Sequence, residues 1–131
     1  MASEWGRAVQ IVVGVVSWVL AVAFLVGGIV RLIVPAARYG QWPNQQWILA
    51  VPRAGVVAIS VAEILGAVGL VVPVLTGIAP ILAPIAACGL AAIMVGALVF
   101  HLRRHERSNV PVAIVLIVLL LFVAIARFAG V

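Results

Sequence analysis

The sequence has very little charge. It contains no lysine and no aspartate, and its only acidic residues are Glu4, Glu63 and Glu106. Charged side chains make up 8% of the 131 residues, whereas a soluble domain is about one quarter charged. So few charges cannot form a water-exposed surface, and 67% of the residues are hydrophobic. The composition excludes an ordinary soluble protein and indicates one domain that is surrounded mostly by lipid.

Cysteine and the common catalytic motifs are also scarce. Cys88 is the single cysteine, which excludes an intramolecular disulfide, and we expect it to be a small buried hydrophobic residue. No glycine-rich phosphate loop, hydrolase elbow or Cys-x-x-Cys motif occurs. We therefore expect no hydrolytic, phosphoryl-transfer or thiol-exchange chemistry from this chain on its own, and no catalytic residue is assigned.

Four long apolar runs dominate the chain, at residues 8–34, 54–72, 81–102 and 110–128. Each has about the 20 residues that a helix needs to cross a bilayer. The sequence therefore predicts an all-α, integral membrane four-helix bundle in a single domain, residues 1–131. We expect Pro73 to end the second helix, and Ser108 or Asn109 to cap the fourth.

The eight basic residues are all arginines, and most flank the apolar runs. They indicate membrane topology rather than a surface for nucleic acid, which we do not expect as a partner. Those in or beside the first and third connections are Arg38, Arg53, Arg103, Arg104 and Arg107. The positive-inside rule then places residues 35–53 and 102–109 in the cytoplasm and both termini outside. The expected location is a bacterial inner membrane.

The longest connection, residues 35–52, is rich in aromatic side chains. Tyr39, Trp42 and Trp47 are residue types that favour the headgroup region of a membrane. We expect a loop with a short helix lying in the interface. Trp42 and Trp47 are read as interfacial anchors or, alternatively, as the mouth of a ligand cavity.

Glu63 is the most informative residue. It lies ~14 Å along the second predicted helix, close to the middle of the bilayer, where an unpaired charge costs about 3 kcal/mol. Three arrangements would relieve that cost: a pair with Arg31, a pair with Arg127, or a protonated carboxyl group. Glu63 is therefore either a functional site, for protons or for a ligand such as a quinone, or a structural bridge between helices.

His101 and His105 are four residues apart and would share one face if the helix continued through them. They lack a third metal ligand with suitable geometry, because Glu106 would point about 100° away from His105. We expect no metal site, and we read this segment as a solvated basic loop. His101 alone, at a helix end, is placed to join Arg31 at the same membrane level.

These segments resemble the DoxX-like family of small four-helix membrane proteins. The resemblance covers residues 24–128 and rests on four pieces of sequence. They are Gly27-Gly28-Ile29-Val30-Arg31-Leu32, Ala62 to Leu70 around Glu63, Gly89 to Ala97 with His101-Leu102-Arg103-Arg104, and Arg127. Carried over by position, Arg31, Glu63, His101 and Arg127 would form the polar core of the family.

The resemblance implies a link to redox complexes, because the family name comes from a subunit of an archaeal thiosulfate:quinone oxidoreductase. Other relatives are linked to oxidative-stress complexes or to membrane-protein assembly. The leading hypothesis is an accessory, quinone-associated subunit, with quinone or lipid as the candidate ligand and a larger complex or homo-oligomer as partner. The alternatives are a proton-coupled exporter of small molecules and a structural or assembly factor without a ligand.

Overall fold

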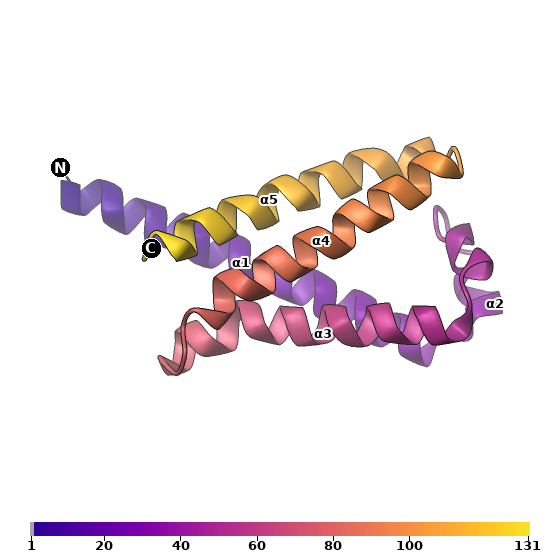
Figure 1. Cartoon of the computed structure of the whole chain (residues 1–131), viewed down its shortest axis with the longest axis horizontal. Coiled ribbons are helices and arrows are strands. Elements are labelled where there is room, and N and C mark those ends of the chain that lie inside the picture. The colour runs from indigo at the N-terminus through magenta and orange to yellow at the C-terminus, as the bar shows by residue number, and fades with distance from the viewer. Residues whose placement is uncertain (1) are drawn as a thin grey trace.

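The computed structural model describes residues 2–131, and in this range the protein is a bundle of helices without strands (Figure 1). The long helices are α1 (Ala2–Ile33), α3 (Arg53–Thr76), α4 (Leu82–Arg103) and α5 (Val110–Phe128). The short ones are α2 (Ala36–Tyr39), η1 (Gln46–Ala50) and η2 (Arg107–Asn109). Four helices in the described range are long and apolar enough to cross a membrane, which confirms the predicted fold class.

Two helix ends differ from the sequence prediction. α1 begins at Ala2, so its N-terminal turns extend beyond the other helices (Figure 1). α3 does not end at Pro73 but continues to Thr76, so that prediction is wrong. A proline inside a helix removes one backbone hydrogen bond, which membrane helices tolerate when they are packed against neighbours. The helix ends instead at Gly77, whose φ of 71° is the left-handed conformation that favours glycine.

Close approach between α1 and α3 depends on Gly28. A Cβ atom added there would lie 2.7 Å from the Ile64 side chain and 2.9 Å from the Ser60 carbonyl oxygen. Only glycine allows this separation, in the manner of small residues at membrane helix interfaces. Gly66 plays a similar part between α3 and α4, because its added Cβ would lie 2.6 Å from Leu90. These contacts set how α3 lies against its two neighbours.

The tightest packing lies away from the loops 35–52 and 104–109. Leu20 and Phe24 of α1, Leu70 of α3 and Leu90 of α4 are buried there, together with Leu120 of α5. All four long helices therefore contribute to one apolar core. Because lipid is as apolar as these side chains, close packing rather than exclusion of water holds such a core together.

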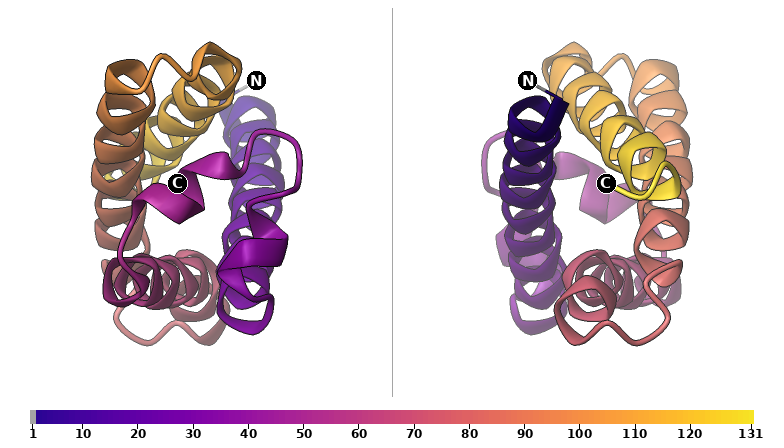
Figure 2. Two further views of the ribbon diagram at one scale, coloured as in Figure 1. Left: turned by 90° about the vertical axis from the view of Figure 1, so that its right-hand side faces the viewer. Right: turned by 90° about the vertical axis from the view of Figure 1, so that its left-hand side faces the viewer.

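Towards the opposite end the bundle opens. In Figure 1, α3 diverges from α4 and α5 in the direction of α2. Figure 2 shows the segment with α2 and η1 lying across that end of the bundle. Both chain termini lie at the far end (Figure 1). The long connection therefore covers the side of the bundle where the helices separate.

The outer faces of the long helices carry exposed apolar side chains, as expected for contact with lipid. Cys88 lies on such a face. It is exposed, so the sequence prediction of a buried cysteine is wrong. The residues around it are small and apolar, so the sequence pattern could not distinguish a lipid-facing position from a core position. Cys88 is consequently no part of the interior.

Candidate functional site

The end of the bundle covered by residues 35–52 encloses a cavity of about 740 Å³. Pockets of this size accommodate small organic molecules. Its polar and aromatic wall includes Arg31, Tyr39, Asn44, Trp47, Glu63, His101 and Asn109. Its apolar wall includes Ile59, Ile93, Met94, Ala97, Val112, Ala113 and Leu116. The lining of the cavity thus combines polar and aromatic side chains with apolar ones.

Of the three arrangements that the sequence allowed for Glu63, the structure has the pair with Arg31. A guanidinium nitrogen of Arg31 forms an ion pair with the Glu63 carboxylate, and Arg31 Nε donates to Ser60 Oγ at 3.2 Å. Glu63 is 3% exposed. A buried carboxylate in this position needs such a partner, because an uncompensated charge in the low-dielectric interior is strongly destabilising.

The direction of the two helices explains why these side chains meet. Helical side chains lean towards the N-terminus of their own helix. Arg31 is in the last turn of α1, so its side chain leans back into the membrane rather than out towards the headgroups. α3 runs the opposite way, so Glu63 leans towards the loop end and towards Arg31. Gly28 supplies the close approach of the helices that this pairing requires.

Arg53 holds the ends of the same two helices together. Its Nη1 and Nη2 donate to the carbonyl oxygens of Arg31 and Leu32, each at 3.1 Å. The last carbonyls of a helix have no partner within the helix, and an arginine side chain can satisfy them. This contact fixes the start of α3 at the end of α1. Apart from the basic residue itself, no sequence pattern indicates this contact.

Trp47 contacts both Arg31 and His101 in the cavity lining. The guanidinium of Arg31 lies 5.9 Å from the centroid of the Trp47 rings, within the range of a cation–π contact. The imidazole of His101 meets Trp47 edge to face at 6.3 Å between centroids. Trp47 Nε1 donates to Gln45 Oε1 at 2.8 Å, which holds the indole in place. Tyr39 packs against Trp47 edge to face as well, at 6.4 Å.

His101 does not share a helical face with His105, because α4 ends at Arg103. His105 has a φ of 57°, and the chain turns back so that Glu106 N donates to His101 O at 2.9 Å. The Glu106 carboxylate then lies 3.2 Å from His101 Nδ1. The sequence prediction treated this segment as a solvated loop and missed that contact. No group of three or more potential metal-ligating side chains occurs among residues 2–131.

The two loops at this end are joined through Asn44. Ser108 Oγ donates to Asn44 Oδ1 at 2.7 Å, and Asn109 Nδ2 donates to Asn44 O at 3.1 Å. Asn109 is the N-cap residue of α5, in agreement with the sequence prediction, but it forms no side-chain capping hydrogen bond. The side chains of Ser108 and Asn109 are used in the link to Asn44 instead. Asn44 has a φ of 65°, a left-handed conformation that asparagine tolerates better than most residues.

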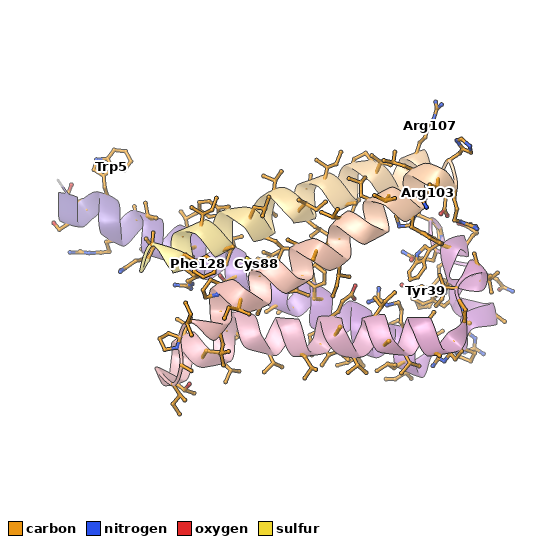
Figure 3. The ribbon with its side chains drawn as sticks, in the orientation of Figure 1. Trp5, Tyr39, Cys88, Arg103, Arg107 and Phe128 are labelled. Atoms are coloured by element: carbon orange, nitrogen blue, oxygen red, sulfur yellow. The ribbon has the colours of Figure 1, made fainter. Side chains whose placement is uncertain are left out.

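Arg127 and Trp42 are not among the residues that line the cavity. Arg127 Nη1 donates to the C-terminal Val131 O at 2.7 Å, at the end of the bundle that holds Phe128 (Figure 3). Trp42 is 40% exposed and packs on Tyr39, with 4.9 Å between ring centroids. The structure therefore brings together Arg31, Glu63, Trp47 and His101 of the sequence-predicted set, and separates Arg127 from them.

This arrangement offers aromatic surfaces and amide groups at the loop end and an aliphatic wall beside them. Figure 3 shows Tyr39 at the same end of the bundle as Arg103 and Arg107, whereas Trp5 and Phe128 lie at the opposite end. The ion pair makes the combined charge of Arg31 and Glu63 zero. Chemically, the site can hold an amphiphilic molecule with an uncharged polar group.

The comparison with known proteins gives one family. No curated protein and no solved structure matches the chain. The sequence model of the DoxX-like family matches residues 15–123, which contain Arg31, Glu63, Trp47 and His101 and most of all four long helices. This small multi-pass membrane protein therefore belongs to the DoxX-like family.

Proposed function

We propose that the cavity binds a lipophilic small molecule of the quinone class, and that the protein is an accessory subunit of a larger membrane complex. The observation that carries the proposal is the combination of aromatic, polar and aliphatic side chains that line the 740 Å³ cavity. A quinone has a flat, uncharged head that stacks on aromatic side chains, and carbonyl oxygens that accept hydrogen bonds. Its hydrocarbon tail suits the aliphatic wall around Met94 and Leu116.

The charge of the site supports an uncharged ligand. Arg31 is already paired with Glu63, so a carboxylate or phosphate ligand would have to compete with Glu63 for the guanidinium. Breaking a buried ion pair costs several kcal/mol because the remaining charge loses its partner. A neutral head group leaves the pair intact and uses Trp47, Tyr39 and the amide of Asn109.

The accessory role rests on the family resemblance, because the family name comes from a subunit of a thiosulfate:quinone oxidoreductase. We further propose that the protein lies in a bacterial inner membrane with the cavity end facing the cytoplasm. The support is the positive-inside rule, because the loops at the cavity end carry most of the arginines. Arg103 and Arg107 both lie at that end (Figure 3).

Export coupled to protons has less support. A coupling carboxylate must be free to exchange a proton for a substrate, and Glu63 is held by Arg31. A purely structural role explains the ion pair but not the cavity beside it. These alternatives are distinguished by whether a molecule occupies the cavity.

Native mass spectrometry of protein purified from its own membrane in mild detergent tests the proposal. The informative variant is Ala97→Phe, which extends a side chain from the cavity wall into the open volume. The matched control is Val95→Phe on the same helix, because Val95 is 47% exposed and does not line the cavity.

We expect the wild-type protein and Val95→Phe to carry one adduct of quinone mass, and Ala97→Phe to lose it. Bare protein in all samples, or an adduct that survives Ala97→Phe, would contradict the proposed function. The same spectra report whether the adduct is a phospholipid instead, and whether the chain is a monomer, a homo-oligomer or bound to a redox subunit.

A further inference from the structure

We propose that His101 passes a proton between a ligand in the cavity and Glu106 at the loop surface, so the ligand carries a hydroxyl group that ionises. This inference rests on the proposed function and assigns a task to two residues that binding alone does not require. It narrows the ligand class to lipophilic enols and phenols, of which a quinol is one example.

The imidazole of His101 lies between two pockets and lines both of them. One is the large cavity, and the other is a pocket of about 210 Å³ that is also lined by His105, Glu106 and Arg107. His101 as a whole is 9% exposed. An imidazole that borders both a ligand cavity and a surface pocket is suited to carry protons, because its two nitrogens can accept and release them at opposite edges.

Glu106 fixes which nitrogen of His101 carries the proton. A carboxylate only accepts hydrogen bonds, so the 3.2 Å contact requires a proton on Nδ1. The amide of Asn109 also lies near Nδ1, at 3.5 Å, but it would need Nδ1 to be unprotonated. The contact with the charged carboxylate is shorter and stronger, so it decides the tautomer. Nε2 then keeps its lone pair, and no group within residues 2–131 forms a hydrogen bond with it.

The charged groups near the imidazole come from the turn after α4 and from the far side of Trp47. Glu106 is shared with Arg104, whose Nε donates to the same Oε1 atom at 2.9 Å. From η1, Trp47 presents its ring, and the charge of Arg31 behind it is matched by Glu63. The other ring that packs against His101 is that of the uncharged Phe100. Among the described residues, Glu106 is therefore the one anionic side chain in direct contact with the imidazole of His101.

The transfer conserves electrons and involves no oxidation. The O–H bond of the ligand breaks, its electron pair stays on the ligand oxygen, and an N–H bond forms at His101 Nε2. The proton on Nδ1 passes to the Glu106 carboxylate and from there to water. The carboxylate also stabilises the imidazolium, which pairs with the ionised ligand until that second proton leaves, as acidic partners do in other carboxylate–histidine pairs.

The test uses a 2-hydroxy-3-alkyl-1,4-naphthoquinone, a lipophilic enol whose anion absorbs visible light. The full chain is placed in phosphatidylcholine nanodiscs, with empty nanodiscs as the blank. Binding of the neutral probe is measured at acidic pH from quenching of tryptophan fluorescence. Visible absorbance against pH then gives the pH at which half of the bound probe has ionised.

Glu106→Gln removes the carboxylate while keeping the size of the side chain. We expect the half-ionisation pH of the bound probe to rise by about one unit, because the imidazolium loses the anion beside it. The affinity for the neutral probe should stay within about twofold, a free-energy change well below 1 kcal/mol. Glu4→Gln, the same charge change on an exposed turn of α1, should leave both quantities unchanged.

Arg104→Gln provides a second, independent variant at a side chain that is 38% exposed. Without Arg104 the carboxylate acts on His101 alone, so the bound probe should ionise at a lower pH than in the wild type. If the neutral probe binds but neither variant moves the half-ionisation pH, the proton path is overturned and the proposed binding function stands. If the wild-type protein quenches no more than empty nanodiscs, the binding proposal fails and this inference falls with it.

Discussion

Arg31 in the last turn of α1 and Glu63 in α3 form an ion pair inside the membrane-spanning part of the bundle. The pair forms because the two helices run in opposite directions and approach closely at Gly28. It lines the cavity as well as joining the helices. Stability and the proposed ligand binding therefore depend on the same contact.

Removing one partner of this pair should cost more than removing both. We expect Arg31→Met and Glu63→Leu each to lower the free energy of unfolding by about 3 kcal/mol, because each leaves a buried charge alone. The double variant should lose less than either single variant, because it leaves no buried charge without a partner. Denaturation of the detergent-solubilised protein by increasing sodium dodecyl sulphate measures all three. Strictly additive losses would show that the two side chains do not interact.

Gly28→Ala should destabilise the protein by about 1–3 kcal/mol, because the new methyl group meets Ile64 and the Ser60 carbonyl and forces α1 and α3 apart. Gly14→Ala is the matched control on the same helix, where an added Cβ has no atom within 4 Å. It should be neutral or stabilising by up to about 1 kcal/mol. Thermal unfolding of both variants in detergent provides the comparison, and equal effects would argue against this account of α1–α3 packing.

The link through Asn44 should govern how often the loop over the cavity opens. Asn44→Ala removes the acceptor for Ser108 and places alanine at a φ of 65°, so local opening should become easier by about 1–2 kcal/mol. Hydrogen–deuterium exchange of the peptide covering residues 40–50 should be faster in this variant. Asn44→Gly, which tolerates that φ, should have a smaller effect, and Gln41→Ala should have none. Unchanged exchange in Asn44→Ala would mean that the link does not restrain the loop.

Single cysteines test the proposed orientation. In a Cys88→Ala background, we expect Ser3→Cys to react with a membrane-impermeant maleimide in intact spheroplasts. Arg107→Cys should react only after permeabilisation, because its loop carries the arginine excess. The reverse pattern would place the cavity end outside the cytoplasm.

The lengths of the apolar runs predict the four membrane-spanning helices. The positions of the arginines predict that the first and third connections lie at the same end of the bundle. For Glu63 the sequence left three arrangements open, because helix direction alone does not specify which arginine can reach it. The packing of Gly28 against Ser60 decides in favour of Arg31. Arg127 was grouped with Glu63 by resemblance, whereas in the structure it is bonded to Val131.

The contacts that build the loop end could not be read from periodicity. His105 turns the chain with a positive φ, and this turn brings Glu106 back to His101. A helical projection of the same residues points Glu106 elsewhere. The bonds from Ser108 and Asn109 to Asn44 join residues that are far apart in the sequence, and no local pattern marks such pairs. The contacts that the sequence missed at this end therefore fall where the backbone leaves the helix.

Photo-crosslinking with an azidoquinone tests most directly whether the cavity is a binding site. The account predicts that light attaches the probe to peptides containing Trp47 or residues 93–101, that excess unlabelled quinone prevents this, and that Ala97→Phe abolishes it while Val95→Phe does not. Labelling spread over the lipid-facing surfaces, insensitive to competitor and equal in the two variants, would contradict the central claim.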